Sequence, residues 1–329
     1  MEVWSNKIVS VIVPTIAKEG YLKKCLASLA GQTHPPEEII VMDNSLDVRF
    51  RHEIVQTYPS IKLYSSQERL SYCASLNKGI SKSSGDFILC LNDDVVLDSR
   101  FIAKALRGFL LDPKVGMVSG KILRRDEKTI DTTGLFLSCY RTAKERGYNF
   151  KDKGQFEQEG YIFGVGGAVG FYRKDMLEDI KEGEDYFDSD FHFFYEDLDV
   201  AWRARLAGWR GYYVPEAIGF HVRGGSVRNK AGIGKPYARR YLDDSLHLDL
   251  LKNRYMAIIK NESCLGFLLH LPCMFLYDLV LWSYILLFRT HLIKKFFFQL
   301  RYLRMAYAKR RFFRRIMKER SNFQKSKNA

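Results

Sequence analysis

The sequence lacks the cysteine pairs of a disulfide-rich scaffold or a zinc module. None of its cysteines forms a C-x-x-C motif, and several lie within apolar stretches. This usage is typical of reduced thiols that act as small hydrophobic side chains in a cytosolic protein. The cysteines are Cys25, Cys73, Cys90, Cys139, Cys264 and Cys273.

Four other signals are absent. Residues 1–8 contain Glu2, Trp4 and Asn6 and no positive segment before an apolar stretch, so we expect no secretory signal. We find no internal repeat and no low-complexity segment. No glycine-rich phosphate loop follows the first apolar run, where Pro14 and Thr15 stand instead, and this argues against a nucleotidyltransferase.

Acidic residues are nearly missing from the C-terminal tail. From Arg289 to Ala329 there are 14 Lys and Arg and one acid, Glu319, so the tail carries +13 of the chain's +14 and the other 288 residues carry +1. A polycationic tail suits anionic lipid or nucleic acid. The alternative is a solvated, frayed terminus.

The first part of the chain alternates strand and helix patterns. Residues 9–13 form a β-branched run that Pro14 stops, which predicts a buried parallel strand. Strands and helices at this spacing predict a parallel sheet with right-handed crossovers. Further strands are expected at 38–42, 61–64 and 87–90, and helices at 20–30, 48–58 and 71–81.

The pattern continues less regularly after Ser99. Residues 124–159 are polar and predict a strand-and-loop insertion of uncertain form. Four glycines at 164, 166, 167 and 170 predict close approach of the backbone to a ligand or to another strand, or close packing alone. We also expect helices from 99 to about 111, over 187–206 and over 241–260, a strand at 115–123, and a strand at 209–214 that Pro215 stops.

An apolar segment precedes the basic tail. Residues 264–288 carry Asp278 as their only formal charge and are long enough to span a bilayer, which needs about 20 apolar residues. His270, Pro272 and Asp278 argue against a plain span, since an Asp near mid-span costs about 2.5–3.5 kcal/mol. Residues 296–317 have the pattern of an interfacial helix. Spanning, interfacial and subunit-contact roles all stay open for 264–288.

Two acidic clusters carry the chemistry. Asn92, Asp93 and Asp94 follow the apolar run at 87–90, at the sheet edge where open α/β folds bind ligands. Their oxygens suit Mg²⁺ or Mn²⁺, which in turn hold phosphates. A solvated turn is the alternative.

The second cluster contains Glu196, Asp197 and Asp199, with Arg203 and His221 further along the chain. Neighbouring carboxylates raise one another's pKa toward the range of a general base. Asp199 and Arg203 have the spacing of a structural ion pair. An ordinary helix N-terminus is the alternative for the cluster.

The order of these motifs resembles the family 2 glycosyltransferases over about residues 8–260. The glycine-rich run, His221 and Lys252-Asn253-Arg254 look most like the bacterial rhamnosyltransferase-type members. The other matching segments are Val-Ser-Val-Ile-Val-Pro-Thr at 9–15, Ile-Val-Met-Asp-Asn-Ser at 40–45, Asn77-Lys78-Gly79-Ile80, Gly85-Asp86 through Asn92-Asp93-Asp94, and Glu196-Asp197-x-Asp199-x-x-x-Arg203.

The resemblance implies an α/β, GT-A fold: a Rossmann-like, mostly parallel sheet with helices on both faces. A helical, membrane-associating C-terminal region would follow it. We expect a catalytic domain over 1–260, with a donor half at about 1–123 and an acceptor half at about 124–260, and a C-terminal region over 261–329. The expected reaction inverts the configuration at the anomeric carbon of a nucleoside diphosphate sugar.

Residue roles follow from the same resemblance. Asp94 would be the main ligand of Mn²⁺ or Mg²⁺, with Asn92 and His221 as further ligands. Asn92 replaces an acid of the family's D-x-D pattern and removes one negative charge. Asp197 would be the catalytic base, and Glu196 would orient it or touch the acceptor. The residues expected to bind the donor are Pro14, Thr15, Asp43, Asn77 and Asp93. Arg223 or Arg228 would reach the diphosphate or lie at the surface.

The resemblance and the basic tail together predict a function at a membrane. The enzyme would transfer a sugar, rhamnose being one candidate, from a dTDP- or UDP-linked donor to a lipid-linked saccharide in bacterial surface polysaccharide assembly. We expect it at the cytoplasmic face of the inner membrane, peripheral or monotopic, with no nucleic-acid partner and with a homo-oligomer as one option. An inactive scaffold and a nucleic-acid-binding protein are the alternatives.

Overall fold

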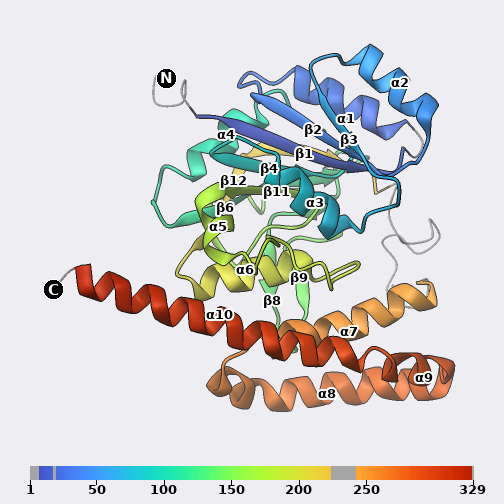
Figure 1. Ribbon diagram of the computed structural model, residues 1–329, viewed down its shortest axis with the longest axis vertical. Helices are drawn as coiled ribbons and strands as arrows, with labels where there is room; N and C mark the ends of the chain where they lie inside the picture. Colours follow the sequence, from blue (N-terminus) through green and yellow to red (C-terminus); the bar gives the residue numbers. More distant parts are fainter. Residues whose placement is uncertain (1–6, 18–19, 224–241, 328–329) are drawn as a thin grey trace.

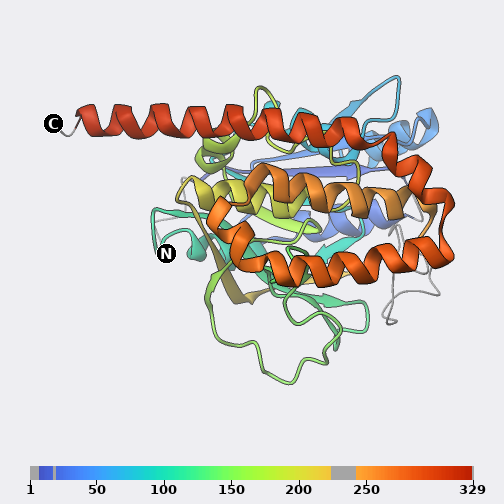
Figure 2. The ribbon, with the colours of Figure 1, turned by 90° about the horizontal axis from the view of Figure 1, so that it is seen from below.

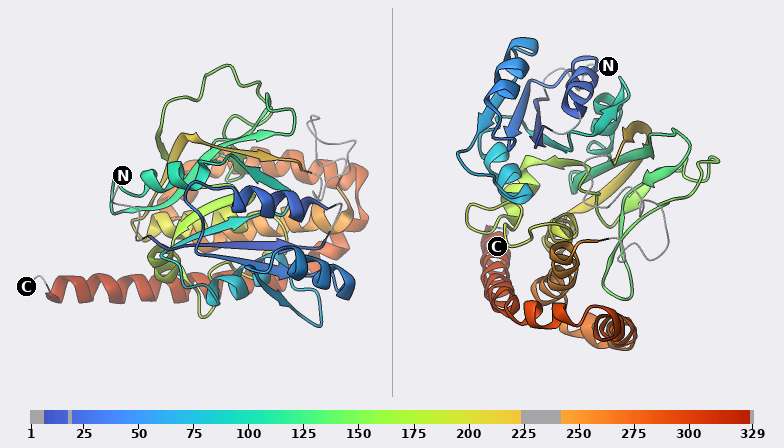
Figure 3. Two further views of the ribbon diagram at one scale, coloured as in Figure 1. Left: turned by 90° about the horizontal axis from the view of Figure 1, so that it is seen from above. Right: turned by 90° about the vertical axis from the view of Figure 1, so that its right-hand side faces the viewer.

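A large mixed sheet forms the centre of the computed structural model, which describes residues 7–17, 20–223 and 242–327, with side chains described as far as residue 319. Its strands follow the order β10-β12-β6-β11-β4-β1-β2-β3. Helices cover both faces, and four C-terminal helices lie together at the end opposite α1 and α2 (Figure 1; Figure 3, right). The chain therefore has the α/β layering that its sequence predicts.

The N-terminal part of the sheet is parallel. β1 (Val9–Thr15) pairs with β2 (Glu38–Asp43) and β4 (Phe87–Leu91), and β2 pairs with β3 (Lys62–Ser65). The crossovers contain α1 (Tyr21–Ala30), α2 (Val48–Thr57) and α3 (Tyr72–Ser81). All seven elements lie close to their predicted ranges.

Alternation along β1 decides which helix covers which face. Val11 and Val13 belong to one core cluster with residues of α1, while Ile12 belongs to the other with residues of α3. Successive side chains of a strand point to opposite faces, so a fully apolar strand is buried on both sides. This is why β1 lies in the middle of the sheet.

Antiparallel strands complete the second part. β11 (Val169–Arg173) lies antiparallel between β4 and β6 (Val115–Arg124), and β12 (Arg210–His221) runs parallel to β6. The other elements here are β5 (Val95–Leu97), α4 (Phe101–Gly108), β7 (Ile130–Thr132), β8 (Leu135–Leu137), β9 (Ala143–Glu145), β10 (Gly160–Ile162), α5 (Lys174–Ile180) and α6 (Glu196–Leu206). The sheet is thus mixed as a whole, and α4 ends three residues before the predicted position.

The prediction that Pro215 stops a strand is wrong. β12 continues to His221, with a register shift against β6 between Val214 and Ile218. The residues between them form a bulge, where proline's missing N–H removes no ladder hydrogen bond. The bulge lets the strand reach far enough to bring His221 opposite Val95 of β5.

Four helices follow the sheet: α7 (Asp244–Asn261), α8 (Cys264–Phe288), α9 (His291–Phe297) and α10 (Leu300–Lys327). The first two residues of the helix predicted over 296–317 end α9, and residues 300–317 lie in α10. The described part of the tail is thus helical. Figure 2 shows α7 between α8 and α10 in projection, and the C-terminal end of α10 extends beyond the body. The predicted domain boundary after residue 260 falls at the C-terminal end of α7, one residue before that helix ends.

The C-terminal helices pack back on the rest of the molecule. Ala306 and Phe313 of α10 are buried in the same core cluster as residues of the sheet and α6. Leu281 and Ile285 of α8 form a smaller cluster with Leu251 of α7 and with α9. α10 thus shares a core with the sheet and α6, and α8 and α9 pack on the body through α7.

Candidate active site

The first acidic cluster lies in the turn between β4 and β5. Thr15, at the end of neighbouring β1, donates its hydroxyl to Oδ2 of Asp93 at 2.5 Å. Burial raises the pKa of Asp93 to about 6, although the Thr15 hydrogen bond opposes the shift. The parallel pairing of β1 and β4 places both residues at the carboxyl ends of their strands, as predicted.

His221 joins Asp94 to a residue that the sequence analysis did not identify, Asp131. Its Nε2 lies 3.2 Å from Oδ1 of Asp94, and its Nδ1 lies 2.8 Å from Oδ2 of Asp131. Burial favours the neutral imidazole, but the hydrogen bonds to Asp131 and Asp94 outweigh it and raise the pKa of His221 to about 9. Arg223 also contacts Asp131. The structure places Arg223 next to the first cluster, whereas Arg228 lies outside the described residues.

These residues fit one edge of a divalent cation site. His221 Nε2 and Asp94 Oδ1 lie 3.2 Å apart, so both could contact one divalent cation when the imidazole is neutral. Asp131 on the other ring nitrogen is the outer contact that orients a ligating histidine. Over the described ranges, no three His, Cys, Asp or Glu side chains form a complete metal cage. Donor phosphates and water would therefore supply the other ligands.

Asn92 is part of a link to the second cluster. The hydroxyl of Tyr72 lies 2.9 Å from both Oδ1 of Asn92 and the carbonyl oxygen of Gly167. The N–H of Gly167 in turn donates to Oδ2 of Asp197 at 3.0 Å. The two clusters are thus connected through the side chain of Tyr72 and the backbone of Gly167. The hydrogen bond from Tyr72 also uses one lone pair of Asn92 Oδ1, the oxygen with which Asn92 would contact a metal.

Glu196 and Asp197 begin helix α6 after a sharp turn. Phe194 and Tyr195 both have positive φ angles, 70° and 72°, and this turn precedes the first helical residue. Burial, followed for Glu196 by the charge of Asp197, raises the pKa of both carboxyls, that of Glu196 to about 8. Within the described part of the chain, Oε2 of Glu196 is buried without a hydrogen-bond partner. Burial without a partner disfavours the ionised form of Glu196, which agrees with its raised pKa.

Glu145 at the end of β9 is a second residue that the sequence analysis missed. Its carboxylate accepts a hydrogen bond from Thr132. Burial and then the charge of Asp197 raise its pKa to about 8. No sequence signal marks it, because it lies in the polar insertion about 50 residues before its spatial neighbours.

The glycine-rich run explains how these carboxylates come together. A Cβ on Gly166 would lie 2.9 Å from Oε1 of Glu145, and one on Gly167 would lie 3.2 Å from Oε1 of Glu196. The absence of side chains lets the backbone pass between the three acids. The prediction of close backbone approach is confirmed, and packing partners fill the space around Gly164 as well.

The predicted donor-binding residues divide into two groups. Asp43 is paired with Thr15 in the β1–β2 register, next to Pro14 at the sheet edge, and contacts Arg51 at 2.7 Å. Asn77 has a structural place instead, because its amide donates to Phe187 O and accepts from two backbone N–H groups of the loop before α6. The structure leaves no free amide group on Asn77 for a donor.

Asp199 and Arg203 form the predicted ion pair, at 2.9 Å. The network extends further than predicted, since Lys260 of α7 lies 3.0 Å from Asp199 and also contacts Asp188. All of these side chains are buried. They fix α6 against α7 and hold the helix that begins with Glu196 and Asp197.

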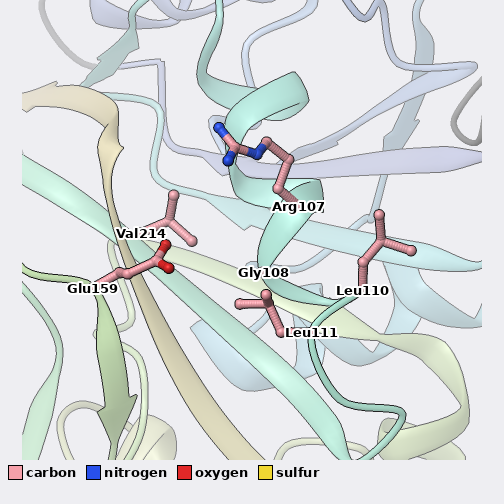
Figure 4. Close-up of a pocket in the computed structure, with 6 residues that line it drawn as sticks. All are labelled: Arg107, Gly108, Leu110, Leu111, Glu159 and Val214. Atoms are coloured by element: carbon pink, nitrogen blue, oxygen red, sulfur yellow. The ribbon is translucent and has the colours of Figure 1, made fainter. Parts of the chain in front are cut away.

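A cavity of about 290 Å³ lies elsewhere in the body, under the C-terminal end of α4 (Figure 4). Its lining contains Arg107, Glu159 and Val214 together with Gly108, Leu110 and Leu111. None of these belongs to either acidic cluster. We assign this cavity no part in the candidate active site.

Solved structures define the class of fold. The crystal structure of GalNAc-T7 with UDP, GalNAc and Mn²⁺ superposes with a TM-score of 0.57 and 13% identity, over 77% of this chain and 48% of that one. The crystal structure of S. aureus TarS 1-349 superposes with a TM-score of 0.52 and 16% identity, over 78% and 66%. The fold is GT-A, as predicted, followed by a helical region with one apolar helix.

The chain belongs to glycosyl transferase family 2, whose family model matches residues 10–181. One relative is the dolichyl N-acetyl-alpha-D-glucosaminyl phosphate 3-beta-D-2,3-diacetamido-2,3-dideoxy-beta-D-glucuronosyltransferase of Methanococcus voltae, 26% identical over 67% of this chain and 68% of its own length. Another is the poly-beta-1,6-N-acetyl-D-glucosamine synthase of Staphylococcus aureus (strain COL), 24% identical over 60% of this chain. The chain spans 45% of that synthase.

Proposed function

We propose that this protein is an inverting glycosyltransferase that moves a sugar from a nucleoside diphosphate sugar to a lipid-linked saccharide. The observation that carries the proposal is the connection of the two acidic clusters through Tyr72 and Gly167. A cation-binding edge and a base with a raised pKa are the two groups that such a transfer needs. Family membership supports the reaction class.

Donor binding is assigned to the carboxyl ends of β1, β2 and β4. Asp43 would accept a hydrogen bond from the nucleobase, with Pro14 and Thr15 beside it, and Asp93 would hold the ribose. Asp94 and His221, with Asn92 at the edge of the site, would hold Mn²⁺ or Mg²⁺. A bound divalent cation would neutralise the charge that develops on the leaving diphosphate.

Acceptor activation is assigned to Asp197, with Glu196 beside it. The acceptor oxygen attacks the anomeric carbon from the face opposite the diphosphate. The bond from that carbon to the diphosphate oxygen breaks, and the diphosphate leaves with the electron pair. The hydroxyl proton passes to the carboxylate of Asp197, whose raised pKa makes it a better acceptor than an ordinary aspartate.

The acceptor and donor identities are finer parts of the proposal. The name of the Methanococcus voltae relative describes an acceptor that is a sugar phosphate on dolichol, which supports a lipid-linked acceptor here. Rhamnose from dTDP-rhamnose is our first candidate donor because of the motif resemblance to rhamnosyltransferase-type members. We place the reaction in the assembly of bacterial surface polysaccharide.

We assign the protein to the cytoplasmic face of the inner membrane as a monotopic protein. α8 is long and apolar enough to cross a bilayer, with a mean hydropathy of 1.8 over its best window and 11% of that window buried. Its charged residue is turned inward, since Asp278 contacts the buried Arg254 of α7 at 2.6 Å. A helix that packs along the catalytic body on one side and is apolar on the other suits the membrane interface.

Sugar transfer by the purified chain tests the proposal. A screen of nucleoside diphosphate sugars with Mn²⁺ or Mg²⁺, read by release of nucleoside diphosphate, identifies the donor, and lipid-linked acceptors are then compared. We expect Asp197→Asn to lose transfer and to keep donor affinity. The matched control is Asp190→Asn, a carboxylate outside the site that contacts Lys309. Full transfer by Asp197→Asn would refute the base assignment.

The inactive-scaffold alternative depends on Asn92, which removes one charge from the cation site. It predicts no nucleotide binding in a calorimetric titration with metal. The nucleic-acid alternative predicts a salt-dependent shift of RNA or DNA that the basic tail alone carries. Donor-dependent release of nucleoside diphosphate would exclude both as the main function.

A further inference from the structure

A groove of about 590 Å³ lies between the end of α7, the start of α8 and the middle of α10. Its size is typical of a small-molecule site. Its walls are largely apolar, with Ile258 and Ile259 from α7, Phe267 and Leu268 from α8, and Tyr307 from α10. None of these residues belongs to the candidate active site, so the groove has no role in the proposed reaction so far.

Three arginines of α10, namely Arg310, Arg311 and Arg314, lie along one rim of the groove. Arg310 is fixed in place because its Nη1 donates to the carbonyl oxygen of Ile259 at 2.7 Å. Burial and then the neighbouring charge of Arg314 lower the pKa of Arg310. In the part of the chain that the structure describes, none of the three forms an ion pair with a carboxylate.

The one acidic side chain of the groove is already neutralised. Glu262 forms a salt bridge with Arg141, and its other oxygen accepts the N–H of Ser263. The three arginines therefore give the groove an excess of positive charge beside its apolar lining, which we call the apolar floor. An anion that also carries a hydrocarbon chain would complement both parts.

The apolar floor continues onto the exposed surface of α8. Leu268, which lines the groove, is 64% exposed. His270 and Asp278 of this helix instead contact the body, since His270 contacts Arg141 and Asp278 contacts Arg254. The exposed apolar stripe contains Leu265, Leu268, Leu269, Phe275, Leu276, Leu279 and Val280.

We propose that this groove binds one anionic phospholipid of the membrane, with its phosphate among Arg310, Arg311 and Arg314. An acyl chain would pass over Phe267 and Leu268 toward the exposed stripe of α8. The proposal goes beyond the sugar-transfer reaction and does not depend on it. It replaces a general attraction between the basic tail and a membrane by a defined binding site, at which α8 and α10 contact one lipid.

A second copy of the chain fits the groove less well than a lipid. A symmetric dimer would use the same surface on both copies, which brings the arginine rims toward one another. Like charges across an interface are unfavourable, whereas a phosphate neutralises them. A soluble phosphate compound would leave the apolar floor and the stripe of α8 exposed to water.

Flotation of the full-length protein with vesicles tests the site. We compare phosphatidylcholine vesicles with vesicles that also contain phosphatidylglycerol, at fixed ionic strength. The test variant is Arg310→Gln/Arg311→Gln/Arg314→Gln. The matched control is Arg301→Gln/Arg304→Gln/Arg315→Gln, which removes the same charge from the same helix at positions that do not line the groove.

We expect the groove variant to bind phosphatidylglycerol vesicles about tenfold more weakly than the control variant, because a headgroup site responds to position as well as to charge. Equal losses in the two variants would overturn the proposal in favour of diffuse attraction. If the triple variant does not fold, the single variant Arg314→Gln, which removes one charge at an exposed position, replaces it. Equal binding by Arg314→Gln and Arg315→Gln would also overturn it.

Two further measurements separate the remaining occupants. Native mass spectrometry of the protein from detergent should retain one phosphatidylglycerol per chain, and the groove variant should retain none. Glycerol phosphate at the same concentration should not displace it, since it lacks the chain that Phe267 and Leu268 contact. Displacement by glycerol phosphate, or a dimer that binds no lipid in light scattering, would refute the lipid site.

Discussion

The N–H of Gly167 donates to Oδ2 of Asp197 at 3.0 Å, and the carbonyl oxygen of the same residue lies 2.9 Å from the hydroxyl of Tyr72. The backbone of one residue therefore holds the proposed base and also contacts the side chain that reaches Asn92. This arrangement makes the position of Asp197 depend on the first cluster, although the two lie about a hundred residues apart in the chain.

Tyr72→Phe removes the hydroxyl that connects the clusters and keeps the ring. We expect kcat to fall about tenfold, because small displacements of a catalytic group cost one to two orders of magnitude in rate. Initial rates at saturating donor and acceptor measure the effect. Tyr58→Phe is the control, since it removes a hydroxyl that donates to Lys23 O, outside the site. Equal kcat values for the two variants would contradict a positioning role of Tyr72.

The pH dependence of transfer follows from the buried acids. A base acts in its deprotonated form, and burial raises the pKa of Glu196 to about 8 and that of Asp197 above its ordinary value. Activity should therefore increase as the pH rises through the apparent pKa of the pair. We expect this pKa to lie well above the usual carboxyl pKa of about 4. Rates measured from pH 5 to about 9 locate this rise.

Glu145→Gln tests the electrostatic part of this explanation. The charges of Glu145 and Asp197 oppose one another's ionisation, which contributes to the raised pKa of Glu145. Removing the negative charge should let the base ionise more easily, so the rising limb of the pH profile should shift to lower pH. Glu157→Gln, an acid on the same insertion that contacts Lys121, is the control. A shift to higher pH in Glu145→Gln would contradict the assignment.

Residues with a local sequence pattern could be predicted, and residues whose role depends on distant contacts could not. Strand β1, Asp93 and Asp94 could be predicted because a buried parallel strand has a local apolar pattern and its carboxyl end has a fixed place at the sheet edge. Asp131 and Glu145 could not, because their roles depend on contacts with His221 and Asp197 that no local pattern records. The prediction that Pro215 ends a strand is wrong for a related reason, since only the pairing of β12 with β6 shows that Pro215 lies in a bulge.

Gly164→Ala tests the packing part of the glycine-rich run. A Cβ at this position would lie 2.3 Å from Cβ of Ala201 in α6, so the helix or the run must move. Overpacking of this kind costs about 1–3 kcal/mol of the free energy of unfolding. Gly160→Ala is the control, since nothing lies within 4 Å of its new Cβ. Urea denaturation measures the free energy of unfolding of both variants. Equal values would contradict the tight packing of Gly164 against α6 that the distances indicate.

Lys260→Met tests how strongly α7 holds the helix that carries the base. Lys260 is buried and contacts Asp188 at 2.5 Å, Asp199 at 3.0 Å and Glu182 at 2.9 Å. Methionine fills a similar volume, but it leaves buried carboxylates without a cation, and breaking a buried pair costs about 3–5 kcal/mol.

Because α6 begins with Glu196 and Asp197, the loss should reach the active site as well as the fold. Urea denaturation should show the larger part of that free-energy change, and the folded fraction should also transfer sugar more slowly. Lys181→Met, which removes a half-exposed partner of Glu178, should change the stability by less than about 1 kcal/mol. A Lys260→Met variant as stable as Lys181→Met would mean that the ion pair with Arg203 and the hydrogen bond from Asn261 hold Asp199 by themselves, and that the buried cation of α7 is not needed to fix α6.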